Sequence, residues 1–398
     1  MSPGSDLAVA ARAASRVLGA SCFEVFAREA ATLELVLDRR GHVQRRQSRE
    51  RGVACRLQRG EALGFGRATG LPQEAGEHAA RLALATVSHD HEPLPPAAHL
   101  GAVPTRHHPP LGEEALRRVF ETLAENPARR EVEVALLKAD TLLHRSEGFT
   151  AHWTNQLLLA FWQQELAPGL RVAFRRAART PGELTMPSAL DLVTQPPRIA
   201  LERPRGLARV LLAPDVAAPL LVLLARSPQL SAARPSPAWD LWDLRHGEEA
   251  FLPMACDGEG YPACNLPLLV PKASAPGRSV RKGASSRGAV RVPWDALPTP
   301  NPVHLWQRET GEPLPQDGLA ALVPVSEVVV EGGGRFRLLA LVAELSEGTV
   351  AAWGVLPVAG SLRRLTTSLL ATAGKVEHVA LGCVVSTPWL WVANLEVG

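Results

Sequence analysis

Apolar and polar residues alternate with a period of two along much of the first ninety residues, after an opening segment, Leu7–Leu18, with helical periodicity. A period of two places successive side chains on opposite faces of a strand, so this pattern predicts a run of antiparallel strands. Asp38–Gly41 has the residues of a hairpin turn. The predicted strands are Cys22–Arg28, Thr32–Asp38, His42–Ser48, Gly52–Gln58 and Ala62–Ala68.

Helical periodicity returns twice in the first half of the chain. Pro72 opens a helix that we expect to run to Thr86, and a second amphipathic helix is predicted at Glu113–Ala124. A sheet covered on one face by helices is the packing that these elements indicate. Further strands are predicted near Glu131–Lys138, Thr141–Arg145, Thr150–Trp162 and Arg171–Arg179.

Prolines divide the chain. Prolines and histidines accumulate in Ser88–Pro110, which predicts an irregular surface crossing because proline removes backbone donors. Gln195-Pro196-Pro197 marks a domain boundary, and 398 residues are enough for two cores. We therefore expect an N-terminal domain over residues 1–200 and a C-terminal domain over residues 201–398.

The second half begins with Val210–Leu230, where a short apolar strand is followed by Asp215, a candidate N-cap, and an apolar helix over Pro219–Arg226. Another helix is predicted at Leu362–Ala373, and Gly332–Gly334 has the composition of a hairpin turn. The expected fold class is α+β, with an N-terminal antiparallel sheet covered by helices and a mainly β C-terminal domain, barrel-like or a sandwich. The predicted strands of this half are Leu266–Val270, Val323–Val330, Phe336–Glu344, Thr349–Val358 and Trp389–Val397.

Composition narrows the classes of function. Hydrophobic residues make up 46% of the chain and charged residues 21%, and no apolar run reaches the roughly 18 residues of a membrane span. A net charge of +3 gives no basic footprint for nucleic acid. The N-terminal segment lacks a signal core, so we expect a cytoplasmic protein that binds neither membranes nor nucleic acid. Five scattered cysteines without a C-x-x-C pair disfavour a disulfide framework and a cysteine zinc site.

Four segments, spread over nearly the whole chain, together carry a family resemblance. They are Thr32–Leu71 with Arg56 and Gly64-Phe65-Gly66, the acidic turn Asp257-Gly258-Glu259-Gly260, the loop Gly283–Arg291, and Ala373-Gly374-Lys375 followed by Ser386-Thr387-Pro388. In order and spacing these segments resemble the TldD/PmbA family, whose members were once called modulators of DNA gyrase.

Active members of that family carry His-Glu-x-x-x-His on the helix that corresponds to Pro219–Arg226, and a cysteine late in the chain. The histidines and the cysteine hold zinc, and the glutamate activates a water, since zinc lowers the pKa of bound water to about 7. The resemblance places these positions at Val222, Leu223, Ser227 and Ala373. Val, Leu and Ala offer no lone pair and a serine hydroxyl is a poor zinc ligand, so we expect no catalytic residue and no metal in this chain.

Loss of all four positions resembles the TldE, or PmbA, branch of the family. The resemblance therefore implies a non-catalytic subunit of a TldD/TldE-type zinc metallopeptidase complex that acts on small or unfolded peptides. Zinc and peptidase activity would come from a TldD-like partner in a heterodimer, and a homodimer of the isolated chain stays open. The alternatives are an independent peptidase with a site outside the family pattern, and a homodimeric peptide-binding or scaffold protein.

Five further residues are candidates for contact with substrate or partner. Asp257 and Glu259 could share one face for acid–base chemistry, although a tight turn with solvated carboxylates explains their glycine-flanked spacing better. Arg287 and Arg291 could clamp a peptide carboxylate or an acidic surface, because arginine pairs with carboxylates through two hydrogen bonds. A solvated loop accounts for them equally well. Lys375 follows from the family's Cys-Gly-Lys ending.

Other conspicuous residues favour structural interpretations. His89 and His91 lie in the proline-rich crossing, which indicates a solvated loop rather than a metal cluster. Cys383 lies too far beyond the lost cysteine position to replace it without a rebuilt loop. Trp389 and Trp391 share one side of their predicted strand, where such spacing is typical of a core, with an interface as the alternative.

Overall fold

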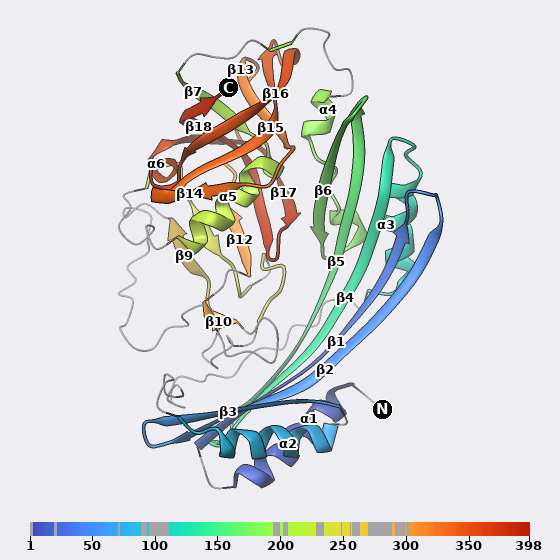
Figure 1. The fold of residues 1–398 in the computed structure, drawn as a ribbon, viewed down its shortest axis with the longest axis vertical. Coiled ribbons are helices and arrows are strands. Elements are labelled where there is room, and N and C mark those ends of the chain that lie inside the picture. Colours follow the sequence, from blue (N-terminus) through green and yellow to red (C-terminus); the bar gives the residue numbers. More distant parts are fainter. Residues whose placement is uncertain are drawn as a thin grey trace.

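The computed structural model describes residues 3–19, 22–70, 72–88, 94, 111–193, 200–201, 206–227, 235–247, 249–254, 256, 263–269, 289–290, 299–300 and 303–398. The predicted α+β class is confirmed (Figure 1). Within the described residues, no helix is long and apolar enough to cross a membrane. The α-helices are α1 (Pro3–Leu18), α2 (Pro72–Ala85), α3 (Glu113–Ala124), α4 (Ala189–Val193), α5 (Pro214–Arg226) and α6 (Leu362–Ser368).

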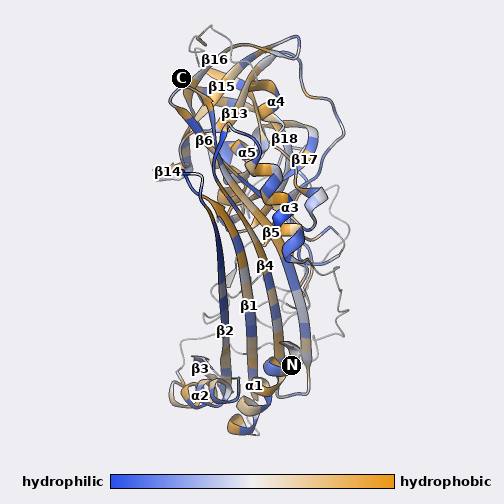
Figure 2. Ribbon diagram, turned by 90° about the vertical axis from the view of Figure 1, so that its right-hand side faces the viewer, coloured by the Kyte–Doolittle hydropathy of each residue, from blue (hydrophilic) through white to orange (hydrophobic). Residues whose placement is uncertain are grey.

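Antiparallel strands form the N-terminal half, in the order β6-β5-β4-β1-β2-β3. The long strands β5, β4, β1 and β2 run side by side along the molecule (Figures 1 and 2), and the short strand β3 lies at one end beside α2 (Figure 1). Three predicted pairs of short strands are in fact single strands, β1, β2 and β4. The reason is visible at Glu29, which interrupts the apolar alternation while its backbone stays paired with Arg51 and Asp140. The strands are β1 (Cys22–Leu37), β2 (Val43–Arg59), β3 (Ala62–Thr69), β4 (Arg129–Arg145), β5 (Thr150–Ala167) and β6 (Leu170–Ala178).

One face of this sheet is covered at both ends of β1. Phe23, Val25 and Ala27 pack with α1 and α2 in one core, whereas Leu35 packs with α3 in another. All four residues have odd numbers, so they project from the same face of the strand. The predicted helical cover is confirmed, and β1 belongs to two separate cores.

Gly64 and Gly66 lie inside β3, in agreement with the strand predicted at Ala62–Ala68. A Cβ atom on Gly64 would lie 1.9 Å from the carbonyl oxygen of Ala83, and one on Gly66 would lie 2.1 Å from that of Ala79. Both carbonyls belong to α2. These glycines therefore allow α2 to lie directly on the sheet.

Shorter strands form the C-terminal half. The Gly332–Gly334 turn is confirmed, since it joins the antiparallel strands β14 and β15. The strands are β7 (Leu207–Leu212), β8 (Leu241–Asp243), β9 (Leu266–Leu269), β10 (Ala289–Val290), β11 (Thr299–Pro300), β12 (His304–Gln307), β13 (Gly318–Pro324), β14 (Val329–Glu331), β15 (Arg335–Ser346), β16 (Thr349–Ser361), β17 (Leu369–Ala380) and β18 (Val384–Val397).

Both halves share one sheet. Val379 of β17 pairs with Arg176 of β6, so the long strands continue into the C-terminal half as β6-β17-β18-β7-β13-β15-β14. Among the described residues the result is a mixed sheet of 16 strands, in which β13 pairs in parallel with β7 and β12 with β18. The expectation of a barrel-like C-terminal domain is corrected accordingly: apart from the separate β10–β11 pair, its described strands belong to this continuous sheet and do not form a clean barrel. The boundary near residue 200 stays a prediction.

Two element predictions in this half are wrong. The helix predicted at Leu362–Ala373 ends at Ser368, because Leu369 begins β17 and pairs with Val392 of β18. The strand predicted at Val323–Val330 is divided, since β13 ends at Pro324, whose nitrogen has no hydrogen to donate to a neighbouring strand. The first error matters for the site, because it moves Ala373 from a helix to a strand.

Candidate functional site

Helix α5 carries three of the four positions that the family resemblance assigns to zinc chemistry. Val222 is buried, Leu223 is half-buried, and Ser227 is the C-cap residue of the helix. Ala373 is buried on β17, where it pairs with Trp389 of β18. Since α5 packs against β17, the fold does bring the two elements together.

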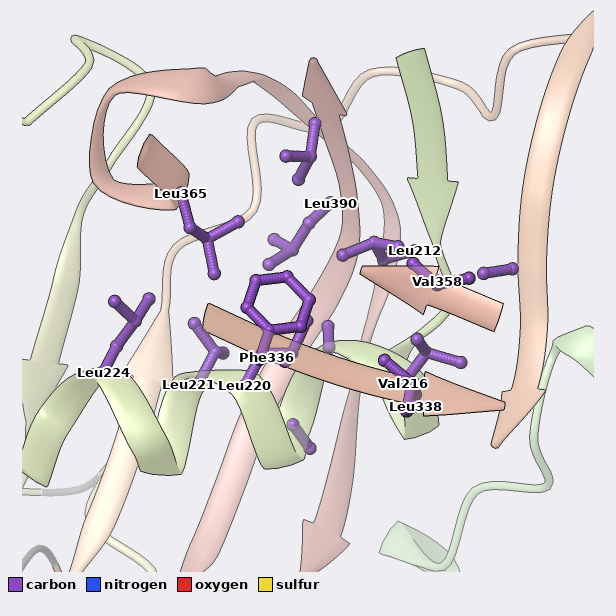
Figure 3. Packing of buried hydrophobic residues seen from close by; sticks show 14 of the residues in the cluster. Leu212, Val216, Leu220, Leu221, Leu224, Phe336, Leu338, Val358, Leu365 and Leu390 are labelled. Atoms are coloured by element: carbon purple, nitrogen blue, oxygen red, sulfur yellow. The ribbon is translucent and has the colours of Figure 1, made fainter. Parts of the chain in front are cut away.

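The surroundings of these positions are apolar. Val216, Leu220, Leu221 and Leu224 of α5 belong to a core filled by carbon side chains (Figure 3). A zinc ion needs lone-pair donors, so the residues present do not fit one. In the described part of the chain, no group of three or more His, Cys, Asp or Glu could hold a metal ion. Side chains from other elements in this core include Phe336, Leu338, Leu365 and Leu390.

Cys383 offers no substitute ligand. It is buried in the same core, and this burial raises the pKa of its thiol to about 12. The neighbouring Arg226 lowers the pKa and Asp243 raises it, both with smaller effects than burial. Metals bind the thiolate, and at neutral pH this group is a thiol.

Asp215 has a different role from the predicted N-cap. Ala213 occupies the N-cap position, and Asp215 lies buried in the first turn of α5. The two Nη atoms of Arg176, on β6, donate to the two carboxylate oxygens of Asp215 over 2.6 and 2.7 Å. Such a bidentate pair fixes the orientation of both groups, and the carboxylate also lies at the favourable end of the helix dipole.

Glu377 of β17 completes this group of residues, the Arg176 cluster. Arg176 Nη2 donates to Glu377 Oε2 over 2.7 Å, and the backbone N–H of Ser188 donates to Oε1 over 2.9 Å. The Ser188 hydroxyl donates to the same Oε1 and accepts from Nε1 of Trp389 at 2.8 Å. Burial raises the pKa of Glu377, against the opposing effects of Arg176 and Ser188. The cluster joins α5 to the two strands at which the halves of the sheet meet.

A second buried group, the His304 cluster, lies one residue further along β17. Phe251 N–H donates to Nδ1 of His304 over 3.2 Å, so the proton of His304 is on Nε2. That nitrogen lies 2.6 Å from Oγ of Ser386, which lies 2.7 Å from Nδ1 of His378. The Ser386 hydroxyl therefore accepts from His304 and donates to His378.

Both imidazoles are neutral at physiological pH. Burial lowers the pKa of His304 to about 3 and that of His378 to about 4. Ser386 is 0% exposed and His304 is 1% exposed. A hydroxyl between two imidazoles resembles an activated nucleophile, but its burial leaves no face open to a substrate. We therefore interpret this cluster as structural.

Two cavities lie along β5 and β6, on the face of the sheet opposite to the face that α3 covers. The first, of about 490 Å³, lies between Arg171 of β6, Pro219 of α5 and Val325 in the β13–β14 connection. The second, of about 550 Å³, lies between β1, β4 and β5 on one side and residues 380–384 of the β17–β18 turn on the other. Arg175 lines both cavities, and we refer to the two together as the groove.

The remaining predicted site residues are not brought together in the described structure. Lys375 is exposed, directly after Gly374, whose φ of +68° suits glycine. Asp257, Glu259, Arg287 and Arg291 lie outside the described residues, as do His89 and His91. For Trp389 the core interpretation is confirmed, since it is 1% exposed.

Sequence reasoning missed the residues that form the two clusters and the groove. Arg176, Glu377, His304, His378 and Ser386 come from four strands, β6, β17, β12 and β18, and follow no spacing motif. A charged residue at a buried position of a predicted strand was the one available signal. Arg176, between apolar positions Phe174 and Ala178 of β6, shows that signal.

Comparison with protein-family models and with curated protein sequences found no match. Comparison with solved structures found similar proteins. A proposed modulator of a DNA gyrase from Thermotoga maritima superimposes with a TM-score of 0.72 at 15% identity, over 97% of this chain and 99% of that one. TldE from Thermococcus kodakarensis gives 0.72 at 12% identity, over 99% and 100%. A proposed modulator of DNA gyrase from Bacteroides thetaiotaomicron gives 0.67 at 13% identity, over 99% and 98%.

These identities are low, and they establish the fold alone. The superposition extends over almost the entire length of each protein, so it includes α5, β17 and the sheet that joins the halves. The similarity predicted from the sequence segments is thus confirmed at the level of the fold. Over its full length, this chain has the fold of TldE and of the proposed modulators of DNA gyrase.

Proposed function

We propose that this chain is a non-catalytic, TldE-like subunit of a TldD/TldE-type zinc metallopeptidase complex that acts on small or unfolded peptides. In this assembly a TldD-like partner supplies the zinc and the catalytic water. The present chain contributes surface and shape to the complex. The full-length fold similarity to TldE supports the assignment.

One observation supports the proposal: α5, the helix to which the family resemblance assigns the zinc-binding positions, is apolar. Val222 and Leu223 have no lone pair, and their neighbours Leu221 and Leu224 are buried in the same core. A histidine in place of Val222 would carry an imidazole into that core, at the cost of burying a polar group without a partner. The side chains of α5 therefore form part of the hydrophobic core, and in the proposed complex another subunit supplies the metal chemistry.

The experiment is co-expression with a TldD-like homologue from the same genome, followed by zinc analysis and a peptide-cleavage assay. We expect a stable one-to-one complex with one zinc, and cleavage only by the complex. The purified chain alone should hold less than stoichiometric zinc and cleave nothing.

A matched control places His304→Gln and His378→Gln in the isolated chain, since both histidines contact the Ser386 hydroxyl. Their substitution should leave its zinc content unchanged. Stoichiometric zinc that disappears in these variants would overturn the proposal, and cleavage by the chain alone would favour an independent peptidase.

A further inference from the structure

The groove that passes Arg175 has a floor with a defined chemical order. In the register of the sheet, Glu133 of β4 pairs with Phe161 of β5, and Phe161 pairs with Arg175 of β6. The guanidinium of Arg175 lies over the Phe161 ring, 5.7 Å from its centroid. A carboxylate, an aromatic ring and a guanidinium thus follow one another across three adjacent strands.

Opposite charges gather on the two sides of that ring. Glu34 joins Glu133 on one side, and both are half-buried, with no ion pair to any described residue. Arg171 joins Arg175 on the other side; both are exposed, and Arg171 forms an ion pair with Glu165 at 4.0 Å. The two half-buried carboxylates are partly desolvated, which is costly unless a cation pairs with them. The groove is therefore suited to a ligand with a positive and a negative end.

Phe161 lies between the charged ends of the groove. Leu159, and beyond it the cross-strand pair Leu137 and Leu157, continue an apolar floor on the side of Phe161 away from Arg171, and Leu252 and Ala380 contribute from the opposite wall. The two cavities, about 490 and 550 Å³, are each within the size range of ligand pockets. An extended, partly apolar molecule fits this shape better than an inorganic ion does.

The separation of the charges sets the length of the ligand. Two strand spacings separate Glu133 from Arg175, about 10 Å, and four residues along β6 separate Arg175 from Arg171, about 13 Å. An extended peptide advances roughly 3.3 Å per residue, so about three to five residues span these distances.

We infer that this groove binds a short peptide with free termini, its α-ammonium group at Glu34 and Glu133 and its α-carboxylate at Arg175 and Arg171. The inference rests on the proposed function for the class of ligand, a peptide, and adds the location and the direction of binding. Arginine suits the carboxylate end because its guanidinium matches a carboxylate with two hydrogen bonds. Phe161, between the two ends, accepts an apolar side chain of the peptide.

The test measures binding of one tetrapeptide of alternating alanine and leucine to the purified full-length chain by calorimetry. The peptide is used unblocked, N-acetylated, and C-amidated. Loss of a charge-assisted contact weakens binding about tenfold, so each blocked peptide should bind about tenfold more weakly than the unblocked one. Glu133→Gln should weaken the unblocked peptide by the same factor and leave the acetylated peptide unaffected. Arg175→Gln should behave in the same way toward the amidated peptide.

The control variants are Arg59→Gln and Glu61→Gln, which are exposed at the turn between β2 and β3, away from the groove. They should leave all three affinities unchanged. Absence of binding, or equal affinity for all three peptides, overturns the inference. Effects of acetylation and of Glu133→Gln that add together also overturn it, because two changes to the same contact do not add.

This test separates the inference from the proposed function. A chain that forms the zinc-containing complex but does not bind the peptide contradicts only the groove. A chain that binds the peptide in the stated direction but never associates with a TldD-like subunit contradicts only the assembly.

Discussion

The Arg176 cluster and the His304 cluster share strand β17, yet they offset the cost of buried polar groups in opposite ways. Glu377 and His378 are consecutive on β17, so they project from opposite faces. On one face, Arg176 offsets the charges of Asp215 and Glu377. On the other, two imidazoles remain neutral around the Ser386 hydroxyl. In the Arg176 cluster, each charged group is stable only while its partners are present. In the His304 cluster, stability depends on pH, because the imidazoles must remain neutral.

The largest expected effect on stability comes from removing the cation of the Arg176 cluster. Arg176→Met leaves the carboxylates of Asp215 and Glu377 buried without a cation, and should lower the free energy of unfolding by about 3 to 5 kcal/mol. Urea denaturation at pH 7 measures it. Adding Asp215→Asn and Glu377→Gln to Arg176→Met should recover part of the loss. A triple variant as unstable as Arg176→Met would show that packing, not charge, is responsible.

The next effect is a pH dependence of the free energy of unfolding, which arises from the neutral histidines of the His304 cluster. Both histidines have folded pKa values below the ordinary 6.5, so their contribution to stability is complete above pH 6.5 and is lost as pH falls toward 4. Each should cost about 2 kcal/mol between pH 6.5 and 5, at 1.36 kcal/mol per pH unit.

The measurement is the unfolding free energy as a function of pH, compared with His378→Gln, which keeps an acceptor for Ser386. The variant should lose about half of the slope. The raised pKa of Glu377 acts with the opposite sign, because protonation relieves its burial as pH falls, and it cancels in the difference. Identical slopes would contradict the assignment of the slope to His378.

A smaller effect is expected from the hydroxyl at the centre of the His304 cluster. Ser386→Ala removes the partner of both imidazoles and should cost about 2 kcal/mol, the cost of leaving buried polar groups unpaired. Thr387→Val is the matched control on the adjacent residue, whose hydroxyl donates to the Pro388 carbonyl. Its loss should be about 1 kcal/mol. Equal losses in thermal unfolding would show that the hydroxyl does not link the histidines.

The smallest effect is expected where an ion pair is exposed. Arg335 and Glu396 form an ion pair at 3.1 Å. The Arg335 side chain is 56% exposed and the Glu396 side chain is 50% exposed. Arg335→Ala should cost about 0.5 kcal/mol or less, because water already solvates both charges. A loss near that of Arg176→Met would remove the distinction between buried and exposed pairs on which the comparison depends.

Local patterns were sufficient for elements whose periodicity is unambiguous. Glu113–Ala124 forms a helix with the predicted bounds, since its apolar residues recur on one face only. Leu362–Ala373 has an equally helical sequence, but the edge of β18 was available to Leu369, and strand pairing prevailed over local preference. A pattern cannot show which pairing partner the rest of the fold supplies.

The site was predictable only where family resemblance supplied positions. Asp215 reads as an N-cap from its neighbours alone, and nothing near it in the sequence indicates Arg176, 39 residues away. The partners of Ser386, His378 and His304, lie 8 and 82 residues away and converge only through the sheet. Long-range convergence of single polar residues leaves no periodic trace in the chain.

The unbroken course of β1 has a consequence for how the chain reaches its fold. Phe23, Val25 and Leu35 project from one face into two cores, and Glu34 projects from the other toward the groove. A slip of one residue against β2 or β4 would exchange these faces along the whole strand. Misregistration therefore cannot remain local: one error would expose both cores and withdraw Glu34 from the groove together. Because β1 is continuous, the correct register at one end of the strand fixes the correct register at the other end.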